Sequence, residues 1–118
     1  MRKKKILIVE DNKDTAGVLQ EYLTDAGFTC NVAVTGRKTL SLFGKDTFHL
    51  LIIDYKLPDM SGLEVVERCW EINASFKALF LTAFNLGNNR NLPANMHYEI
   101  LQKPCKPTKI LQTIKRML

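Results

Sequence analysis

Short apolar runs alternate with amphipathic stretches along the 118 residues of this chain. The runs are too short for buried helices and are rich in Ile, Leu, Val and Phe, a composition typical of buried strands. They predict five strands, over residues 6–9, 28–34, 50–53, 76–81 and 98–101. Strands that alternate with helical patterns form βαβ units, which build a parallel sheet covered by helices. The pattern therefore predicts an α/β fold with a five-stranded parallel sheet.

Four stretches between these runs have the apolar spacing of amphipathic helices. The first follows Asn12 and ends at Gly27, and the second covers residues 37–44. The third begins at Ser61 with the spacing of a capping box, and the last begins at Pro107, which suits the first turn of a helix. The side chains that we expect to face the core are Ala16, Leu19, Tyr22, Leu23, Ala26, Leu40, Phe43, Leu63, Val66, Cys69, Trp70, Ile110, Leu111, Ile114, Met117 and Leu118.

The segment from Phe84 to Asn95 interrupts this pattern. It contains five asparagines together with Gly87 and Pro93, and all three residue types are poor in helix interiors. A further helix is expected here on topological grounds, because the strands on either side must run parallel. We predict that this fourth helix is short, irregular or mobile.

The composition is that of one globular domain over residues 1–118, with 46% hydrophobic and 25% charged residues. No apolar run approaches the ~20 residues that a membrane span needs. The basic start is followed by too short an apolar run for a signal peptide. We therefore expect a cytoplasmic protein that does not insert into a membrane, and Met1 directly before the first strand favours an N-terminal place for the domain.

The net charge of +5 raises the question of a nucleic-acid or acidic partner. The cations are dispersed apart from Lys3–Lys5 and a set near the C-terminus, and no aromatic residues lie between them to stack on bases. We interpret the charge as a solvated face and expect no nucleic acid to be bound by this domain.

The predicted strands end in residues that can carry chemistry. Glu10 and Asp11 follow the first strand, Asp54 the third, Thr82 the fourth and Lys103 the fifth. Open α/β sheets place their ligands at this carboxyl edge. Three carboxylates within ~4 Å repel by roughly 4 kcal/mol per pair at an effective dielectric near 20, so they coexist in ionised form only around a cation. Hard oxygen ligands suit Mg²⁺, and a carboxylate can attack phosphorus to form an aspartyl phosphate.

These residues resemble the receiver domain of two-component response regulators, the CheY-like family. The resemblance covers the whole chain and is carried by residues 5–12, by Asp54 with residues 56–62, by Thr82-Ala83 and by Lys103-Pro104. It implies a flavodoxin-like (βα)5 fold, a three-layer sandwich around a doubly wound sheet. It also implies Mg²⁺-dependent transfer of a phosphoryl group from a kinase phosphohistidine to Asp54, which switches a partner-binding surface.

The resemblance implies four residues around the metal. Asp11 and Asp54 would bind Mg²⁺ directly, and Lys56 would contribute its backbone carbonyl. Glu10 would act through a metal-bound water; the family often has Asp here, so the side chain is longer by one methylene.

The phosphoryl group has its own implied contacts. The Thr82 hydroxyl would donate to a phosphoryl oxygen, and the small Ala83 would leave room for the group to enter. Lys103 would pair with the phosphate as a point charge. The bond between Lys103 and Pro104 is expected to be cis.

The switch is where this chain departs from the family pattern. Receivers usually carry an aromatic residue three positions before the lysine, and this chain has Ile100 there and Tyr98 two residues earlier. Isoleucine is stiff at χ1 and has no hydroxyl. We therefore expect residues 84–97, rather than a ring swing, to respond to phosphorylation.

Three alternatives remain open. A metal-dependent phosphatase of the haloacid dehalogenase type would carry a second Asp two residues after the nucleophile, where this chain has Lys56. A flavodoxin-like cofactor binder shares the fold, but Glu10 and Asp11 would repel a flavin phosphate. A pseudo-receiver that is never phosphorylated would have no need of the acids, Thr82 and Lys103 together.

The implied partners are a sensor histidine kinase or phosphotransfer protein and an unknown output partner or domain. The protein is expected to be a monomer or weak dimer, and no enzyme beyond catalysing its own phosphorylation and dephosphorylation. His49 and His97 are expected to be ordinary residues, because the donor histidine in this family belongs to the partner.

Overall fold

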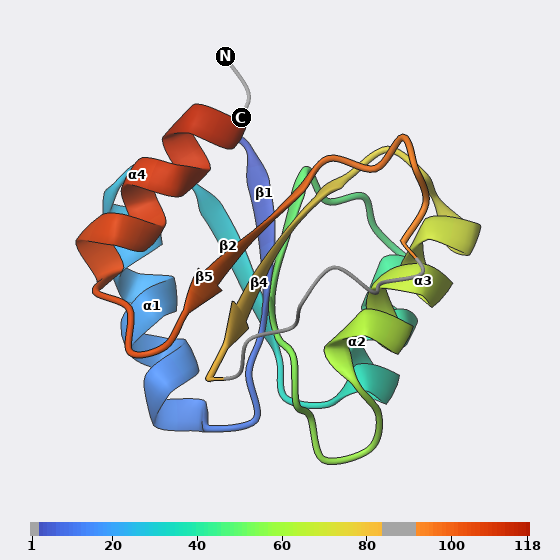
Figure 1. Ribbon diagram of the computed structural model, residues 1–118. Coiled ribbons are helices and arrows are strands. Elements are labelled where there is room, and N and C mark those ends of the chain that lie inside the picture. The colour runs from blue at the N-terminus through green and yellow to red at the C-terminus, as the bar shows by residue number, and fades with distance from the viewer. Residues whose placement is uncertain (1–2, 84–91) are drawn as a thin grey trace.

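Five parallel strands form one sheet in the computed structural model, which describes residues 3–83 and 92–118. The strands are β1 (Lys5–Val9), β2 (Thr29–Ala33), β3 (Leu50–Asp54), β4 (Lys77–Thr82) and β5 (Tyr98–Gln102). Their order across the sheet is β2-β1-β3-β4-β5 (Figure 1). This is the doubly wound order of flavodoxin-like folds, and it confirms the predicted fold class.

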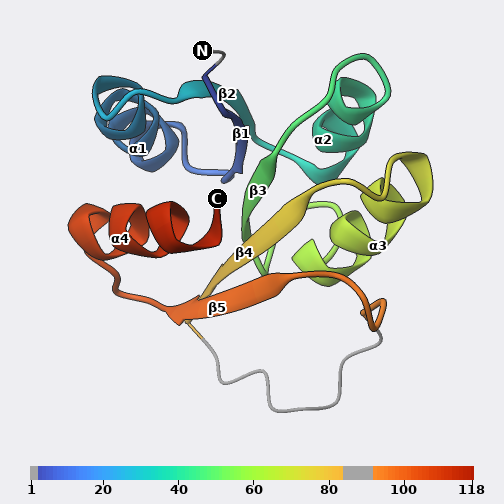
Figure 2. The ribbon, with the colours of Figure 1, turned by 90° about the horizontal axis from the view of Figure 1, so that it is seen from above.

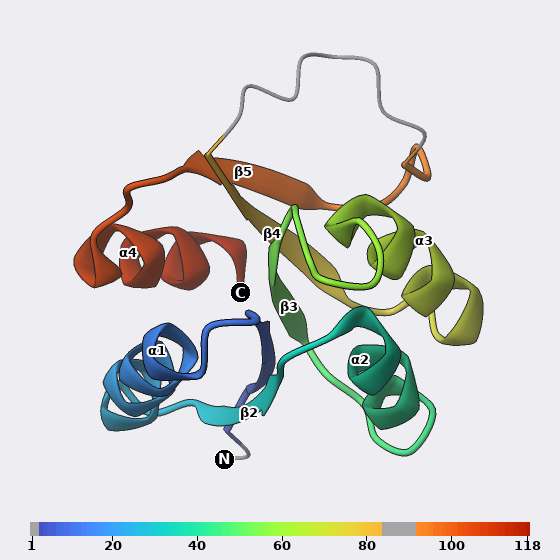
Figure 3. The ribbon, with the colours of Figure 1, turned by 90° about the horizontal axis from the view of Figure 1, so that it is seen from below.

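Helices cover both faces of the sheet in the described residues. They are α1 (Lys13–Asp25), α2 (Gly36–Phe43), α3 (Gly62–Ile72) and α4 (Pro107–Met117). Figures 2 and 3 show α1 and α4 on one face and α2 and α3 on the other. The arrangement is the three-layer sandwich that the family resemblance implies. None of these helices is long and apolar enough to cross a membrane.

The core is divided by the sheet into two clusters, because successive side chains of a strand point to opposite faces. In β1, Ile6 and Ile8 pack towards α1 and α4, whereas Leu7 and Val9 pack towards α2 and α3. The central strand β3 is buried on both faces over residues 50–53. A sheet buried on both sides holds its strand ends in fixed positions, which is what a site at the carboxyl edge requires.

The helix starts follow from local hydrogen bonds. The Asn12 side chain accepts from the N–H groups of Asp14 and Thr15, and the Ser61 hydroxyl accepts from the Glu64 N–H at 3.1 Å. Both caps lie where the sequence predicts helix starts. The expected stripe of α3 omitted Val65, which is fully buried; a helix that packs on a sheet buries a wider arc than a strict stripe.

The predicted fourth helix lies mainly outside the described residues, which resume at Leu92. Between there and β5 the chain forms a turn, in which the Met96 N–H donates to the Pro93 carbonyl at 3.1 Å. Tyr98 and Ile100 on β5 pack against the cluster on the α2 and α3 side, and the Tyr98 ring meets Phe80 edge to face. The expectation for residues 84–97 as a switch stays a prediction.

Candidate functional site

Three carboxylates meet at the carboxyl edge of the sheet. Glu10 and Asp11 follow β1, and Asp54 is the last residue of β3, the strand that pairs with β1. One carboxylate oxygen from each residue lies within 4.8 Å of the others. Glu10 and Asp54 are half-buried and Asp11 is exposed, so the cluster is open to solvent on one side. Oxygen ligands in this arrangement can hold a hard divalent cation.

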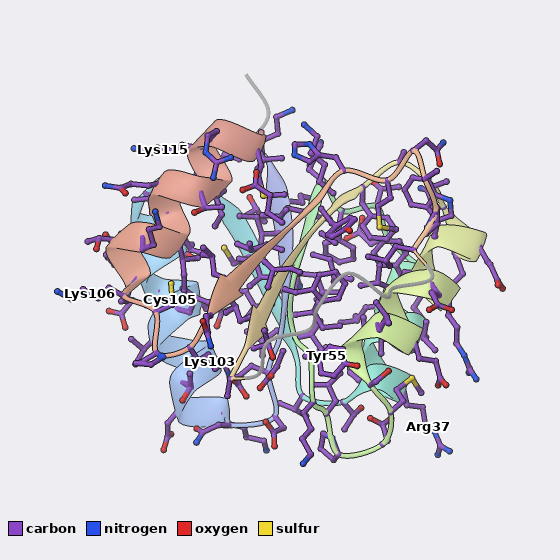
Figure 4. The ribbon with its side chains drawn as sticks, in the orientation of Figure 1. Arg37, Tyr55, Lys103, Cys105, Lys106 and Lys115 are labelled. Atoms are coloured by element: carbon purple, nitrogen blue, oxygen red, sulfur yellow. The ribbon has the colours of Figure 1, made fainter. Side chains whose placement is uncertain are left out.

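Lys103 directly follows the edge strand β5 and reaches the acidic cluster from there. Its Nζ atom lies 2.8 Å from Asp54 Oδ2 and 3.4 Å from Glu10 Oε1. Burial opposes the charge of Lys103, but the hydrogen bonds and charges of Asp54 and Glu10 together outweigh it and raise the pKa of the ammonium. Figure 4 shows Lys103 where β4 and β5 end. Its bond to Pro104 is cis, as expected.

The charges of the cluster do not balance. Among the described residues, the ammonium of Lys103 contacts two of the three carboxylates, Glu10 and Asp54, and Asp11 lies in the same cluster. Burial raises the pKa of Glu10, as does the side-chain hydrogen bond with Asp11, against the hydrogen bond from the Asn12 N–H at 3.1 Å. The donor set and its excess of negative charge therefore fit a bound Mg²⁺.

A cavity of about 370 Å³ lies beside these groups. Its lining brings together Asp11, Asp54, Lys56, Leu57, Pro58, Thr82, Ala83 and Lys103. All the predicted site residues except Glu10 are in this set, and Glu10 lines an adjoining groove of about 890 Å³ between α1 and α4. The structure thus places six predicted residues around one cavity and Glu10 in the adjoining groove, and their individual roles stay predictions.

The loop between β3 and α3 forms one wall of the cavity. The Lys56 N–H donates to Asp54 Oδ1 at 3.3 Å, and a bridge pairs Lys56 with Ser61 across the base of the loop. Gly62 closes this base, since its N–H donates to the Tyr55 carbonyl at 2.6 Å. A Cβ atom at Gly62 would lie 2.4 Å from the Asp54 carbonyl oxygen. Only glycine therefore allows α3 to begin this close to the end of β3.

Sequence reasoning missed several residues of this wall. Leu57 and Pro58 line the cavity, and the sequence marks them only as part of a turn. The requirement for Gly62 could have been predicted from the sequence, because a glycine directly after a helix cap indicates that other backbone atoms approach closely there. The contacts of Asp59, described below, have no local signal.

Comparison with known proteins agrees with this geometry. The family model for the response regulator receiver domain matches residues 6–115. The response regulator receiver protein CpdR of Brucella abortus is 29% identical over 116 residues, which cover 98% of this chain and 97% of that protein. The probable transcriptional regulator ycf29 of Porphyra purpurea is 32% identical over 116 residues, covering 96% of this chain but only 56% of the regulator. The chain therefore spans little more than half the length of some relatives.

A solved structure shows the same architecture. The receiver domain protein (CheY-like) from Methanospirillum hungatei superposes with a TM-score of 0.89 at 28% identity, over 98% of this chain and 94% of that chain. The family match covers nearly the whole sequence, and the acidic cluster and Lys103 lie at the edge of the sheet where the resemblance expects them. The chain belongs to the receiver domain family of two-component response regulators.

Proposed function

We propose that the protein is a phosphorylated receiver in which Asp54 accepts the phosphoryl group. The observation that supports this is the convergence of Asp54 with Glu10, Asp11 and Lys103 beside a cavity that Thr82 also lines. A structural role for any one of these residues would not require the others to meet at the same point.

The proposed reaction is an in-line displacement at phosphorus. A carboxylate oxygen of Asp54 forms the new O–P bond while the N–P bond of a phosphohistidine breaks, and the electron pair stays on the departing imidazole nitrogen. Lys103 is already 2.8 Å from Asp54 Oδ2 and would follow the negative charge onto the phosphoryl oxygens. The Thr82 hydroxyl would donate to one of these oxygens, and Ala83 would leave space at the cavity wall.

The same proposal includes a resident Mg²⁺. Glu10, Asp11 and Asp54 would hold it, together with the backbone carbonyl of Lys56. When bound, the ion would neutralise charge on the carboxylates and on the phosphoryl oxygens. The side chains would hold the acceptor oxygen in place, and Lys103 would supply positive charge beside Asp54.

The proposed context is that of the family. A sensor histidine kinase or phosphotransfer protein would donate the phosphoryl group, and an output partner or domain would read the change. A single cytoplasmic domain over residues 1–118 and a monomer or weak dimer are part of this proposal. Lys56 stands where a haloacid dehalogenase-type phosphatase has its general acid, so turnover of phosphate esters is not proposed.

The test is phosphorylation by acetyl phosphate and Mg²⁺, read as a mobility shift on a Phos-tag gel. Wild type should shift and Asp54→Asn should not. Asp46→Asn is the matched control, because Asp46 lies at the opposite edge of the sheet and pairs with Lys5. An equal shift in wild type and Asp54→Asn would remove Asp54 as the acceptor. No shift in wild type would favour a pseudo-receiver, and steady hydrolysis of p-nitrophenyl phosphate would favour a phosphatase.

A further inference from the structure

Asp59 lies in the loop between β3 and α3, but its side chain is bonded to α2. Asp59 Oδ1 accepts from the Gly36 N–H at 2.8 Å, and Oδ2 accepts from the Arg37 N–H at 2.9 Å. These are N–H groups of the first turn of α2, which have no partner within the helix. The hydrogen bonds from Gly36 and then Arg37 lower the pKa of Asp59, so the carboxylate is ionised at neutral pH.

An apolar contact supports the same junction. A Cβ atom at Gly36 would lie 2.5 Å from Met60 Cγ and 2.8 Å from Val65 Cγ2. The backbone of α2 therefore approaches the loop as closely as a glycine permits. Met60 packs against the buried cluster on this side of the sheet. Asp59 and Met60 together attach the outer half of the loop to the start of α2.

The inner half of the same loop faces the phosphoryl site. Lys56, Leu57 and Pro58 line the cavity beside Asp54. Pro58 directly precedes Asp59 and has a fixed φ angle, so the connection between the two halves is short and stiff. The base of the loop is closed by the bridge between Lys56 and Ser61. A shift in the position of Asp59 should therefore also shift residues 56–58, because the backbone between them is short and stiff.

We propose that Asp59 is a positioning residue: by holding the first turn of α2 it fixes the wall formed by residues 56–58. The inference rests on the proposed function of the cavity and adds Asp59, a residue that does not line it. Groups that orient a metal ligand from outside typically change metal affinity by about 10–100-fold when removed. Loss of Asp59 should therefore weaken the response to Mg²⁺ while Asp54, Glu10 and Asp11 remain in place.

The competing explanation is that Asp59 only caps α2. A substitution at Thr35 distinguishes capping of α2 from positioning of the cavity wall. Thr35 Oγ1 accepts from the Lys38 N–H at 3.0 Å in the same turn, without involving the loop. Thr35→Ala removes a cap from α2 and leaves the attachment of the loop intact. Asp59→Asn keeps one acceptor oxygen of the side chain and so keeps one of the two bonds.

The experiment measures the initial rate of phosphorylation by acetyl phosphate as a function of Mg²⁺ concentration, with melting temperatures in parallel. Asp59→Ala should raise the half-saturating Mg²⁺ concentration by about tenfold, the lower end of the usual range for such groups. The half-saturating Mg²⁺ concentration of Asp59→Asn should lie between those of Asp59→Ala and wild type. Thr35→Ala should lower the melting temperature but leave the half-saturating concentration at the wild-type value.

The outcomes distinguish the two claims. If wild type is phosphorylated and the Asp59→Ala and Thr35→Ala curves coincide, Asp59 is only a helix cap and this inference fails alone. If wild type takes no phosphate, the proposed function fails and this inference falls with it. Should Asp59→Ala not fold, an Asp59→Asn curve that coincides with wild type overturns the inference, and a rightward shift supports it.

Discussion

The two edges of the sheet carry similar residue types but use them differently. At the amino edge, where the amino-terminal ends of the strands lie, the polar groups named here each have one partner. Lys5 forms an ion pair with Asp46, and its backbone N–H donates to His49 Nδ1 at 2.9 Å. Lys77 extends its ammonium to the carbonyl of Met117 at the end of α4. Each contact joins two segments of the chain, and Lys5 with Asp46 is a pair of opposite charges.

At the carboxyl edge the pairing is unequal. The ammonium of Lys103 contacts Glu10 and Asp54, and Asp11 adds a third carboxylate to the same cluster. Like charges held together by the fold lower its stability, and natural proteins retain such strain where function needs it. In this chain, the cluster in which carboxylates outnumber the ammonium that contacts them lies at the end of the sheet that holds the proposed site.

The largest expected effect is the loss of Mg²⁺-induced stabilisation when a carboxylate of the carboxyl edge is removed. In wild type, Mg²⁺ at one hundred times its dissociation constant should stabilise the fold by about 2.7 kcal/mol through mass action. Asp11→Ala should abolish this shift, because it removes a proposed direct ligand, whereas Asp46→Ala at the amino edge should retain it. Thermal melts with and without Mg²⁺ measure both. Equal shifts in wild type and Asp11→Ala would sink the metal assignment.

The next effect concerns the cation already in the cluster. Lys103→Ala removes a hydrogen bond between charged groups, a type worth about 1.5–3 kcal/mol, and leaves the three carboxylates without their ammonium. The metal-free protein should therefore melt lower, while the Mg²⁺-induced shift should equal or exceed that of wild type. A Mg²⁺ shift that disappears in Lys103→Ala would show that the lysine helps to bind the metal rather than competing with it. Phosphorylation of this variant should also fail to produce the conformational change that we expect in wild type, and hydrogen exchange of both proteins measures it.

A smaller loss of stability is expected when a hydrogen bond of the amino edge is removed. His49→Ala removes the acceptor of the Lys5 N–H and should lower the free energy of unfolding by about 1 kcal/mol. Phosphorylation at saturating Mg²⁺ should keep the wild-type rate, because the change lies at the far end of the strands. Urea denaturation and the Phos-tag assay check the two parts. A His49→Ala protein that is as stable as wild type but is phosphorylated more slowly would contradict this prediction, because it would show that the amino edge affects the reaction at the carboxyl edge.

The smallest effect is the pH dependence of the amino edge. The hydrogen bond from Lys5 lowers the pKa of Asp46 below its ordinary value of 3.8. A carboxyl whose pKa is lower in the folded state stabilises the fold above pH 3.8 and loses this contribution as pH falls through the folded pKa. Asp46→Asn should reduce the slope of stability against pH in this acid range and leave it unchanged near neutrality. High salt should shrink the difference, because the pair is exposed.

Much of the fold and the gathering of the site could be predicted from sequence, for local reasons. The strands are short apolar runs, and parallel strands bring their carboxyl ends to one edge, so Glu10, Asp11, Asp54 and Lys103 had to approach one another. The start of α3 at Ser61 was readable because a cap is formed by residues close in sequence.

The remaining features depend on contacts between distant residues. The hydrogen bonds that Asp59 accepts from the Gly36 and Arg37 N–H groups join residues 23 and 22 positions apart. No pattern within one segment predicts them. The burial of Val65 likewise depends on how α3 lies against the sheet and against Gly36. These features arise from packing, which the spacing of residues in one segment does not determine.

The most direct test of the central claim is chemical trapping of the phosphorylated residue. Borohydride reduces an acyl phosphate to an alcohol, so an aspartyl phosphate becomes homoserine. After treatment with acetyl phosphate, Mg²⁺ and then borohydride, peptide mass spectrometry should find homoserine at position 54 alone, and none when acetyl phosphate is omitted. Homoserine at another acidic residue, or a phosphate that survives borohydride on a serine or threonine, would contradict the account.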